Sequence, residues 1–414
     1  MSKKYLITFL TEFMVLLAGI WVYRLAADFG TADFSNYALS RRIVSLVQPV
    51  VLLGMAVSLP RQLASVHDTA LLESSRYFIA SAIWPLILCG VFALSALMFP
   101  GWLAYIFLGS ADMSFLMFPI VVMICGLVWQ SLVYSYFRGK MLISSANLLQ
   151  LITMGVVPVT AFFISANISM VLMVTGICWL LIPVLFLAPE WTAFIKHGMP
   201  EKIHMNELYV FGLQRVPGDI AYAMLFAAPP LLTAHYFGIT QAGFVAFGIT
   251  LLNMASAALN PISIILLPEA RKMVVEMKFD LLLARSRKLI LNVFFLSAAG
   301  VIVFEVFAGS ILQMYLGSAD PDLVLVTRLL VPGAIGLAVF VVLRSIIDAY
   351  YKKALNTLNV LMSFSVFLIF ILFFLLFDAP FWLPLAGFSC AMFFLGGIAI
   401  YRIVRIKHIE TRSK

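Results

Sequence analysis

Long apolar stretches alternate with short polar connections along the whole chain. A helix that crosses a hydrocarbon core of about 30 Å needs about 20 residues. Twelve apolar stretches meet this length, near residues 5–27, 36–59, 77–99, 113–135, 142–164, 168–189, 208–232, 243–267, 286–308, 323–347, 354–377 and 380–401. Because a backbone in lipid must satisfy its own polar groups, we expect each stretch to be a helix. The pattern predicts an all-α integral membrane protein with twelve transmembrane helices.

Composition supports the same class. Hydrophobic residues make up 63% of the chain and charged residues only 11%, whereas soluble domains average about 25% charged residues. The first apolar stretch is too long for the core of a signal peptide, and no small-residue cleavage site follows it. We therefore expect this stretch to remain as the first helix.

The charges of the connections predict the orientation, because Lys and Arg stay on the cytoplasmic side. Alternate connections carry Lys3 and Lys4, Arg61 and Arg76, Arg138 and Lys140, Lys196 and Lys202, the bases between Arg271 and Lys288, Lys352 and Lys353, and those from Arg402 to Lys414. The other six connections contain no Lys or Arg, and their charged residues are the acids Asp28, Asp33, Asp112, Asp320, Asp322 and Asp378. Both termini are therefore expected in the cytoplasm.

The second half of the chain repeats the first. The string LGSAD occurs at residues 108–112 and again at 316–320, an offset of 208. The same offset brings Phe29-Gly30 onto Phe237-Gly238 and Pro60 onto Pro268. We interpret LGSAD itself as the end of a helix, a turn and the cap of the next helix.

Six helices return the chain to its starting side, so the two halves insert with the same orientation. We expect an N-terminal six-helix lobe over 1–190, a cytoplasmic linker over 191–207 and a C-terminal six-helix lobe over 208–414. Parallel repeats of this kind are a transporter architecture, in which substrate passes between the repeats by alternating access.

Six arginines lie within or at the rims of the predicted helices: Arg24, Arg41, Arg42, Arg215, Arg328 and Arg344. Arginine suits phosphate because its planar, permanently charged group binds two oxygens at once. Arg41, Arg42 and Arg215 lie deep enough that a buried charge needs water or a partner, which favours a polar lumen over a structural ion pair. Arg24, Arg328 and Arg344 lie near helix ends. Their side chains can extend to the polar membrane interface there, which explains these arginines without a functional role.

Three acids also lie within predicted helices: Glu12, Asp219 and Glu305. Asp219 is about 16 Å along the helix over 208–232, close to the bilayer midplane. Pro217 and Gly218 separate it from Arg215, so this segment is either a hinge beside a charge pair or a static kink with a satisfied pair. With the offset of 208, Asp219 falls next to Glu12. We expect these acids to couple transport to a proton or sodium gradient.

Three segments carry a family resemblance: FGTADFSNYAL, LLPEARKM and FGLQRVPGDIAYAML. They resemble the multidrug/oligosaccharidyl-lipid/polysaccharide exporter superfamily, and within it the Wzx-type polysaccharide flippases. The resemblance implies a flippase that carries undecaprenyl-pyrophosphate-linked repeat units across the bacterial inner membrane for O-antigen-like assembly. By resemblance to lipid II flippases, Arg24 and either Arg41 or Arg42 would meet the pyrophosphate.

Other chemistry is absent from the sequence. No phosphate-binding loop with Lys and no convincing catalytic triad or carboxylate pair is present, and the four cysteines show no metal-ligand spacing. We expect no enzyme activity, no cofactor and no metal. The net charge of +8 follows from topology and attraction to anionic lipid, so we expect no nucleic-acid partner.

Two other functions remain open beside the flippase. One is a drug or cation antiporter of the same superfamily, and the other is a membrane glycosyltransferase or polymerase. The deepest charges comprise Arg41, Arg42 and Arg215 against Glu12 and Asp219, which favours an anionic substrate. The short connections disfavour the glycosyltransferase. The expected partners are the lipid-linked glycan, membrane lipids and, as a candidate, the polysaccharide polymerase machinery.

Overall fold

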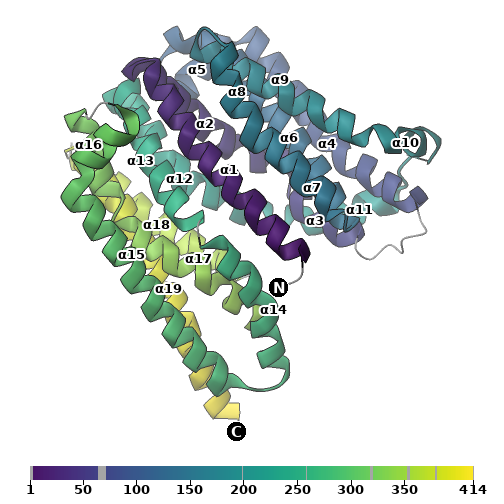
Figure 1. The fold of residues 1–414 in the computed structure, drawn as a ribbon, viewed down its shortest axis with the longest axis vertical. Coiled ribbons are helices and arrows are strands. Elements are labelled where there is room, and N and C mark those ends of the chain that lie inside the picture. Colours follow the sequence, from purple (N-terminus) through teal and green to yellow (C-terminus); the bar gives the residue numbers. More distant parts are fainter. Residues whose placement is uncertain are drawn as a thin grey trace. The chain divides into compact units, whose positions relative to one another are not determined.

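A computed structural model describes residues 3–63, 71–197, 199–257, 259–317, 320–351, 355–377 and 380–413. Every regular element in these ranges is a helix (Figure 1). The first half contains α1 (Lys3–Asp28), α2 (Thr31–Leu52), α3 (Met55–Leu63), α4 (Leu71–Met98), α5 (Pro100–Leu108), η1 (Ala111–Leu116), α6 (Met117–Gly139), α7 (Ile143–Gln150), η2 (Leu151–Val156), α8 (Val157–Ile164), α9 (Ile168–Leu187), η3 (Ala188–Glu190) and α10 (Trp191–His197).

The second half contains α11 (Lys202–Leu213), α12 (Val216–Phe237), α13 (Ile239–Ala257), α14 (Asn260–Val275), α15 (Phe279–Leu316), α16 (Pro321–Leu330), α17 (Gly333–Tyr350), α18 (Leu355–Phe377) and α19 (Trp382–Ser413). Eleven helices of the described chain are long and apolar enough to span a membrane, and twelve do so if the bent pair α2 and α3 counts as one span. The predicted class, an all-helical multi-pass membrane protein, is therefore confirmed.

Several spans depart from the straight helices that the sequence predicts. The second one bends by 48° between α2 and α3, where Leu53 and Gly54 have φ angles of 52° and 74°. A π-helical segment, η2, interrupts the fifth span between α7 and α8. The expected helix over 243–267 is divided into α13 and α14. The length of an apolar stretch predicts that a span is present. The bend, the π-helical segment and the divided helix instead depend on how each span packs against its neighbours.

The two LGSAD strings form the local structure that we predicted. Gly109 and Gly317 end α5 and α15 in the left-handed region, with φ angles of 74° and 83°. Ser110 then caps η1 by accepting the Asp112 N–H at 3.3 Å. In the second copy, Asp320 caps α16 by accepting the Asp322 N–H at 2.9 Å. Residues 318 and 319 lie outside the described chain, as do Lys352, Lys353 and Asp378 of the predicted connections.

The chain forms two compact units. The first comprises Met1–Ala223 with Ala234–Gly243, and the second comprises Met224–Thr233 with Phe244–Lys414. The linker expected over 191–207 therefore falls within the first unit. The lobe boundaries at 190 and 208 remain a prediction.

In each unit, a glycine allows two spans to approach each other closely. In the first unit, a Cβ atom on Gly176 of α9 would lie 2.7 Å from the backbone nitrogen of Met123 on α6. In the second unit, a Cβ atom on Gly396 of α19 would lie 2.6 Å from the carbonyl oxygen of Gly336 on α17. Because lipid supplies no hydrophobic drive for helix association, small residues that allow close approach stabilise membrane helix pairs. The fourth and sixth spans of each half thus pack in the same way.

Candidate functional site

Arg41 and Arg42 lie next to each other on α2 in the first unit. Gly30, with a φ angle of 98°, precedes this helix, and Asp33 lies in its first turn. Arg42 is only 8% exposed, and Tyr23 and Tyr222 lie within electrostatic reach of its guanidinium. Arg41 is half-buried. This stretch of α2 therefore places two adjacent positive charges inside a membrane-spanning unit.

Trp179 on α9 lies against the guanidinium group of Arg41. The guanidinium carbon of Arg41 lies 5.8 Å from the centroid of the indole ring, a distance typical of cation–π attraction. The indole Nε1–H donates to the carbonyl oxygen of Thr153 at 2.5 Å, and Thr153 belongs to the π-helical segment η2. Sequence reasoning missed Trp179, because a tryptophan in an apolar span has no distinguishing pattern.

Arg24 forms an ion pair within α1. Its Nη1 atom lies 3.2 Å from Oδ1 of Asp28, one helical turn later on α1, and both side chains are partly exposed. An exposed pair at this spacing contributes only about 0.3–0.5 kcal/mol. A role of Arg24 in substrate binding remains a prediction.

The segment around Arg215 differs from the sequence prediction. The predicted helix over 208–232 is two helices, because α11 ends at Leu213 and α12 begins at Val216. Pro217 lies in the first turn of α12, where its missing N–H is not needed and its fixed φ favours helix initiation. The predicted depth of Asp219, about 16 Å along a helix that begins at residue 208, is therefore wrong, because the helix that carries Asp219 begins at Val216.

Asp219 accordingly occupies the first turn of α12, where the helix dipole favours an acid. The backbone N–H groups of Gly218 and Asp219 both bond the carbonyl oxygen of Arg215 at 3.0 Å. Arg215 is exposed and Asp219 is half-buried. The ion pairs within 4.0 Å among described residues do not include these two side chains. A hinge role for Pro217 and Gly218 remains a prediction.

Glu12 has a neighbour that the sequence did not indicate. This half-buried residue of α1 lies within electrostatic reach of Arg138 near the end of α6. The Arg138 guanidinium lies 5.6 Å from the ring centroid of Tyr134. Asp219 instead lies within electrostatic reach of Arg215. The two acids related by the repeat therefore have different basic neighbours.

The remaining predicted residues lie in the second unit. Glu305 on α15 is half-buried, and its Oε1 atom has no hydrogen-bond partner among the described residues. Arg328 on α16 lies within electrostatic reach of the Glu305 carboxylate. Arg344 on α17 is half-buried, and its carbonyl oxygen accepts from Asn356 Nδ2 at 2.9 Å. These residues therefore belong to a different unit from Arg41 and Arg42.

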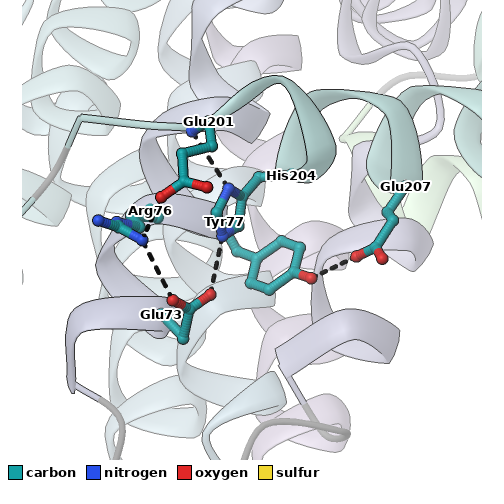
Figure 2. A network of polar contacts seen from close by, with 6 residues as sticks. All are labelled: Glu73, Arg76, Tyr77, Glu201, His204 and Glu207. Atoms are coloured by element: carbon teal, nitrogen blue, oxygen red, sulfur yellow. Dashed lines mark hydrogen bonds and ion pairs between the residues drawn. The ribbon is translucent and has the colours of Figure 1, made fainter.

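A further polar network joins α4 to α11 within the first unit, and sequence reasoning missed it (Figure 2). We call it the α4–α11 network, and its members are Glu73, Arg76, Tyr77, Glu201, His204 and Glu207. His204 Nε2 lies 2.8 Å from Glu73 Oε2, and Arg76 Nη1 lies 2.7 Å from Glu201 Oε1. The only sequence signal was the spacing of Glu73 and Arg76, which form a pair three residues apart at 3.3 Å.

Comparison with known structures identifies the fold. An inward-facing multidrug resistance MATE family transporter of the MOP superfamily superposes with a TM-score of 0.74 at 13% identity, over 97% of this chain and 96% of that chain. The outward-facing conformation of such a transporter gives 0.64 at 12% identity, over 99% and 96%. The MATE multidrug transporter DinF-BH gives 0.65 at 13% identity, over 97% and 96%.

No protein-family model and no curated protein sequence matches the chain. The structural matches nevertheless cover nearly all of it. The protein is therefore an all-helical, multi-pass membrane protein with a MATE-like fold, similar to transporters of the MOP superfamily.

Proposed function

We propose that the protein is a flippase that carries undecaprenyl-pyrophosphate-linked oligosaccharide repeat units across the bacterial inner membrane by alternating access. The product would serve the assembly of an O-antigen-like surface polysaccharide. The MATE-like fold supports a transporter. The resemblance of the segments around α2, α12 and α14 to Wzx-type flippases supports the substrate class.

The observation that carries the proposal is the adjacent pair Arg41 and Arg42 on α2. A diphosphate offers two or more negative charges and several oxygens, and a guanidinium group binds such oxygens in pairs. Arg42 is buried, and Arg41 lies over Trp179. Both positions reduce hydration of the guanidinium groups and strengthen their attraction for an anion. The lipid tail would meanwhile stay in the bilayer.

Glu12 and Asp219 are the proposed coupling groups for a proton or sodium gradient. Each is a half-buried acid on a candidate span, and each has an arginine within electrostatic reach. Protonation or cation binding would change the balance of charge in each pair. Intramembrane acids commonly serve as such relays.

The test is a flipping assay in proteoliposomes with a fluorescent undecaprenyl-pyrophosphate glycan. We expect Arg42→Ala to lower the rate roughly 10- to 100-fold, since a hydrogen bond to a charged group is worth about 1.5–3 kcal/mol. Arg287→Ala is the matched control, because Arg287 is an exposed arginine near the start of α15. Wild-type flipping by Arg42→Ala in a correctly folded sample would refute the arginine site.

Export of cationic drugs is the second candidate, because matched structures are multidrug transporters. A cationic substrate would be repelled by Arg41 and Arg42 and would instead need Glu12 or Asp219. The same vesicles loaded with a fluorescent organic cation separate the two functions. Gradient-driven cation efflux without glycan flipping would favour the antiporter.

A further inference from the structure

The protonation state of His204 follows from its hydrogen bonds. Its Nδ1 atom accepts the backbone N–H of Glu201 at 3.2 Å, and an amide N–H can only donate, so Nδ1 carries no proton. The ring proton is therefore on Nε2, which donates to Glu73 Oε2 at 2.8 Å. The side chain is only 4% exposed. Neutral His204 thus has both ring nitrogens satisfied without water.

His204 also takes part in the cap that begins α11. Glu201 is the N-cap residue, and its side chain accepts the backbone N–H of His204 while its own N–H donates to the His204 ring. This reciprocal arrangement satisfies two backbone donors at the start of a helix. Either bond depends on the other, because both fix the same two residues.

Within the described ranges, the charged groups recorded around His204 lie on α4 and at the start of α11. Glu73 and Arg76 lie on α4, and Arg76 Nη1 bonds both Glu73 at 3.3 Å and Glu201 at 2.7 Å. The Tyr77 ring, also on α4, meets the His204 ring edge-on at 4.7 Å, and its hydroxyl donates to Glu207 (Figure 2). The α4–α11 network therefore contains three carboxylates and one guanidinium, so its named members carry excess negative charge while His204 is neutral.

We propose that His204 is a proton-sensitive clasp that holds the first turn of α11. A second proton, taken from water, binds Nδ1 and turns this atom from an acceptor into a donor. The ring keeps its bond to Glu73 on α4, but it loses the Glu201 N–H. The first turn of α11 then loses one cap bond, while its link to α4 remains. The proposed role of His204 goes beyond the proposed function, and it does not depend on which substrate the protein carries.

The rest of α11 has its own contacts with the first unit. Ser58 Oγ donates to the Leu208 carbonyl at 2.7 Å, and the Arg61 guanidinium lies 4.0 Å from the Phe211 ring centroid. Neither contact includes a group that titrates near neutral pH. Protonation of His204 therefore loosens only the beginning of the helix, near residues 199–205.

Hydrogen exchange of the full-length protein in nanodiscs tests the clasp. Histidines ordinarily change charge between about pH 5 and 8. After correction for intrinsic exchange, we expect protection of residues 199–205 to fall about tenfold from the upper to the lower end of this range, as loss of one hydrogen bond predicts. Protection that stays constant across the range would overturn the proposal.

Two variants of the clasp sharpen the result. His204→Asn keeps an oxygen that accepts the Glu201 N–H but cannot gain a proton, so its protection should not depend on pH. Glu73→Gln keeps an acceptor for Nε2–H but removes the negative charge that stabilises the imidazolium. The fall in protection in Glu73→Gln should therefore require a lower pH than in the wild type. A fall in His204→Asn equal to that of the wild type would contradict the assignment.

His235→Asn is the matched control. His235 lies on α12 in the first unit, and its Nε2 is 2.9 Å from the carbonyl oxygen of Ile106, away from the α4–α11 network. This variant should retain the full pH dependence of residues 199–205. Loss of the dependence in His235→Asn would assign the effect to another histidine and overturn the clasp.

Discussion

Arg41 lies over the indole ring of Trp179, and Trp179 is held by the carbonyl oxygen of Thr153. Thr153 belongs to the π-helical segment η2. A local irregularity of one helix thus provides the carbonyl oxygen that binds the indole of Trp179 on another helix. The orientation of a guanidinium inside the membrane thus depends on three separate spans. Trp179 is a positioning residue in this arrangement.

Substitution of Trp179 measures its contribution. Trp179→Phe keeps an aromatic face for Arg41 but loses the hydrogen bond to Thr153, so we expect a loss of stability of about 1 kcal/mol with little change in glycan flipping. Trp179→Leu also removes the cation–π contact, worth about 0.5–2 kcal/mol. Flipping should therefore fall several-fold further in Trp179→Leu. Equal rates in both variants would show that the ring face does not matter.

The fork geometry of Arg42 provides a second test at the residue scale. Arg42→Lys retains one positive charge but loses the planar group that binds two phosphate oxygens. We expect flipping by Arg42→Lys to stay well below the wild type in the proteoliposome assay. Full activity would mean that charge alone is sufficient at this position.

At the scale of the elements, the close contact of α6 with α9 recurs as α17 with α19. Each contact depends on a glycine that faces backbone atoms of its partner. The sequence predicted the repeat from LGSAD and from glycines at helix ends, and the packing of the fourth and sixth spans extends it. Glycine content alone could not reveal this contact, because Gly397, the next residue after Gly396 on α19, faces open space.

Gly176→Ala should therefore destabilise the first unit. The added Cβ would lie 2.7 Å from the Met123 nitrogen, and overpacking of this kind costs about 1–3 kcal/mol. Gly90→Ala on α4 is the control, since its Cβ would meet nothing within 4 Å. Thermal unfolding in detergent should show a lower Tm for Gly176→Ala and a Tm equal to or above the wild type for Gly90→Ala. The reverse order would show that α6 and α9 can move apart freely.

At the scale of the whole molecule, the direction of insertion follows from charge rather than from packing. The predicted inner connections carry Lys and Arg, and the outer ones carry neither. Lys202 is the first residue of α11, and Asp112 lies in η1 after the third span. The two positions should therefore face opposite sides of the membrane.

Cysteine labelling in intact cells tests this orientation. In a variant without the native cysteines, Asp112→Cys should react with a membrane-impermeant maleimide, and Lys202→Cys should react only after the membrane is opened. The natural cysteines lie within helices, so their replacement leaves the connections unchanged. Labelling of Lys202→Cys from outside would reverse the predicted topology.

Coupling to an ion gradient is also a property of the whole molecule. Asp219→Asn and Glu12→Gln remove the proposed ion-coupling carboxylates while preserving side-chain size. We expect both variants to lose the dependence of flipping on a proton or sodium gradient, with slow downhill movement retained. Gradient-dependent transport at the wild-type rate in both variants would remove these acids from the mechanism.

The sequence by itself determined the class of the protein, the approximate place of most spans and the turns at the two LGSAD strings. Lipid forces each span to satisfy its backbone locally, so apolar length is sufficient evidence, and glycines such as Gly109 and Gly317 end helices through their own conformational freedom. Only the tertiary structure decided which side chains meet. Arg41 with Trp179 and Glu73 with His204 are each more than a hundred residues apart, as are Glu12 and Arg138, which lie within electrostatic reach of each other. Their pairing depends on how spans pack against one another, which no local pattern of residues encodes.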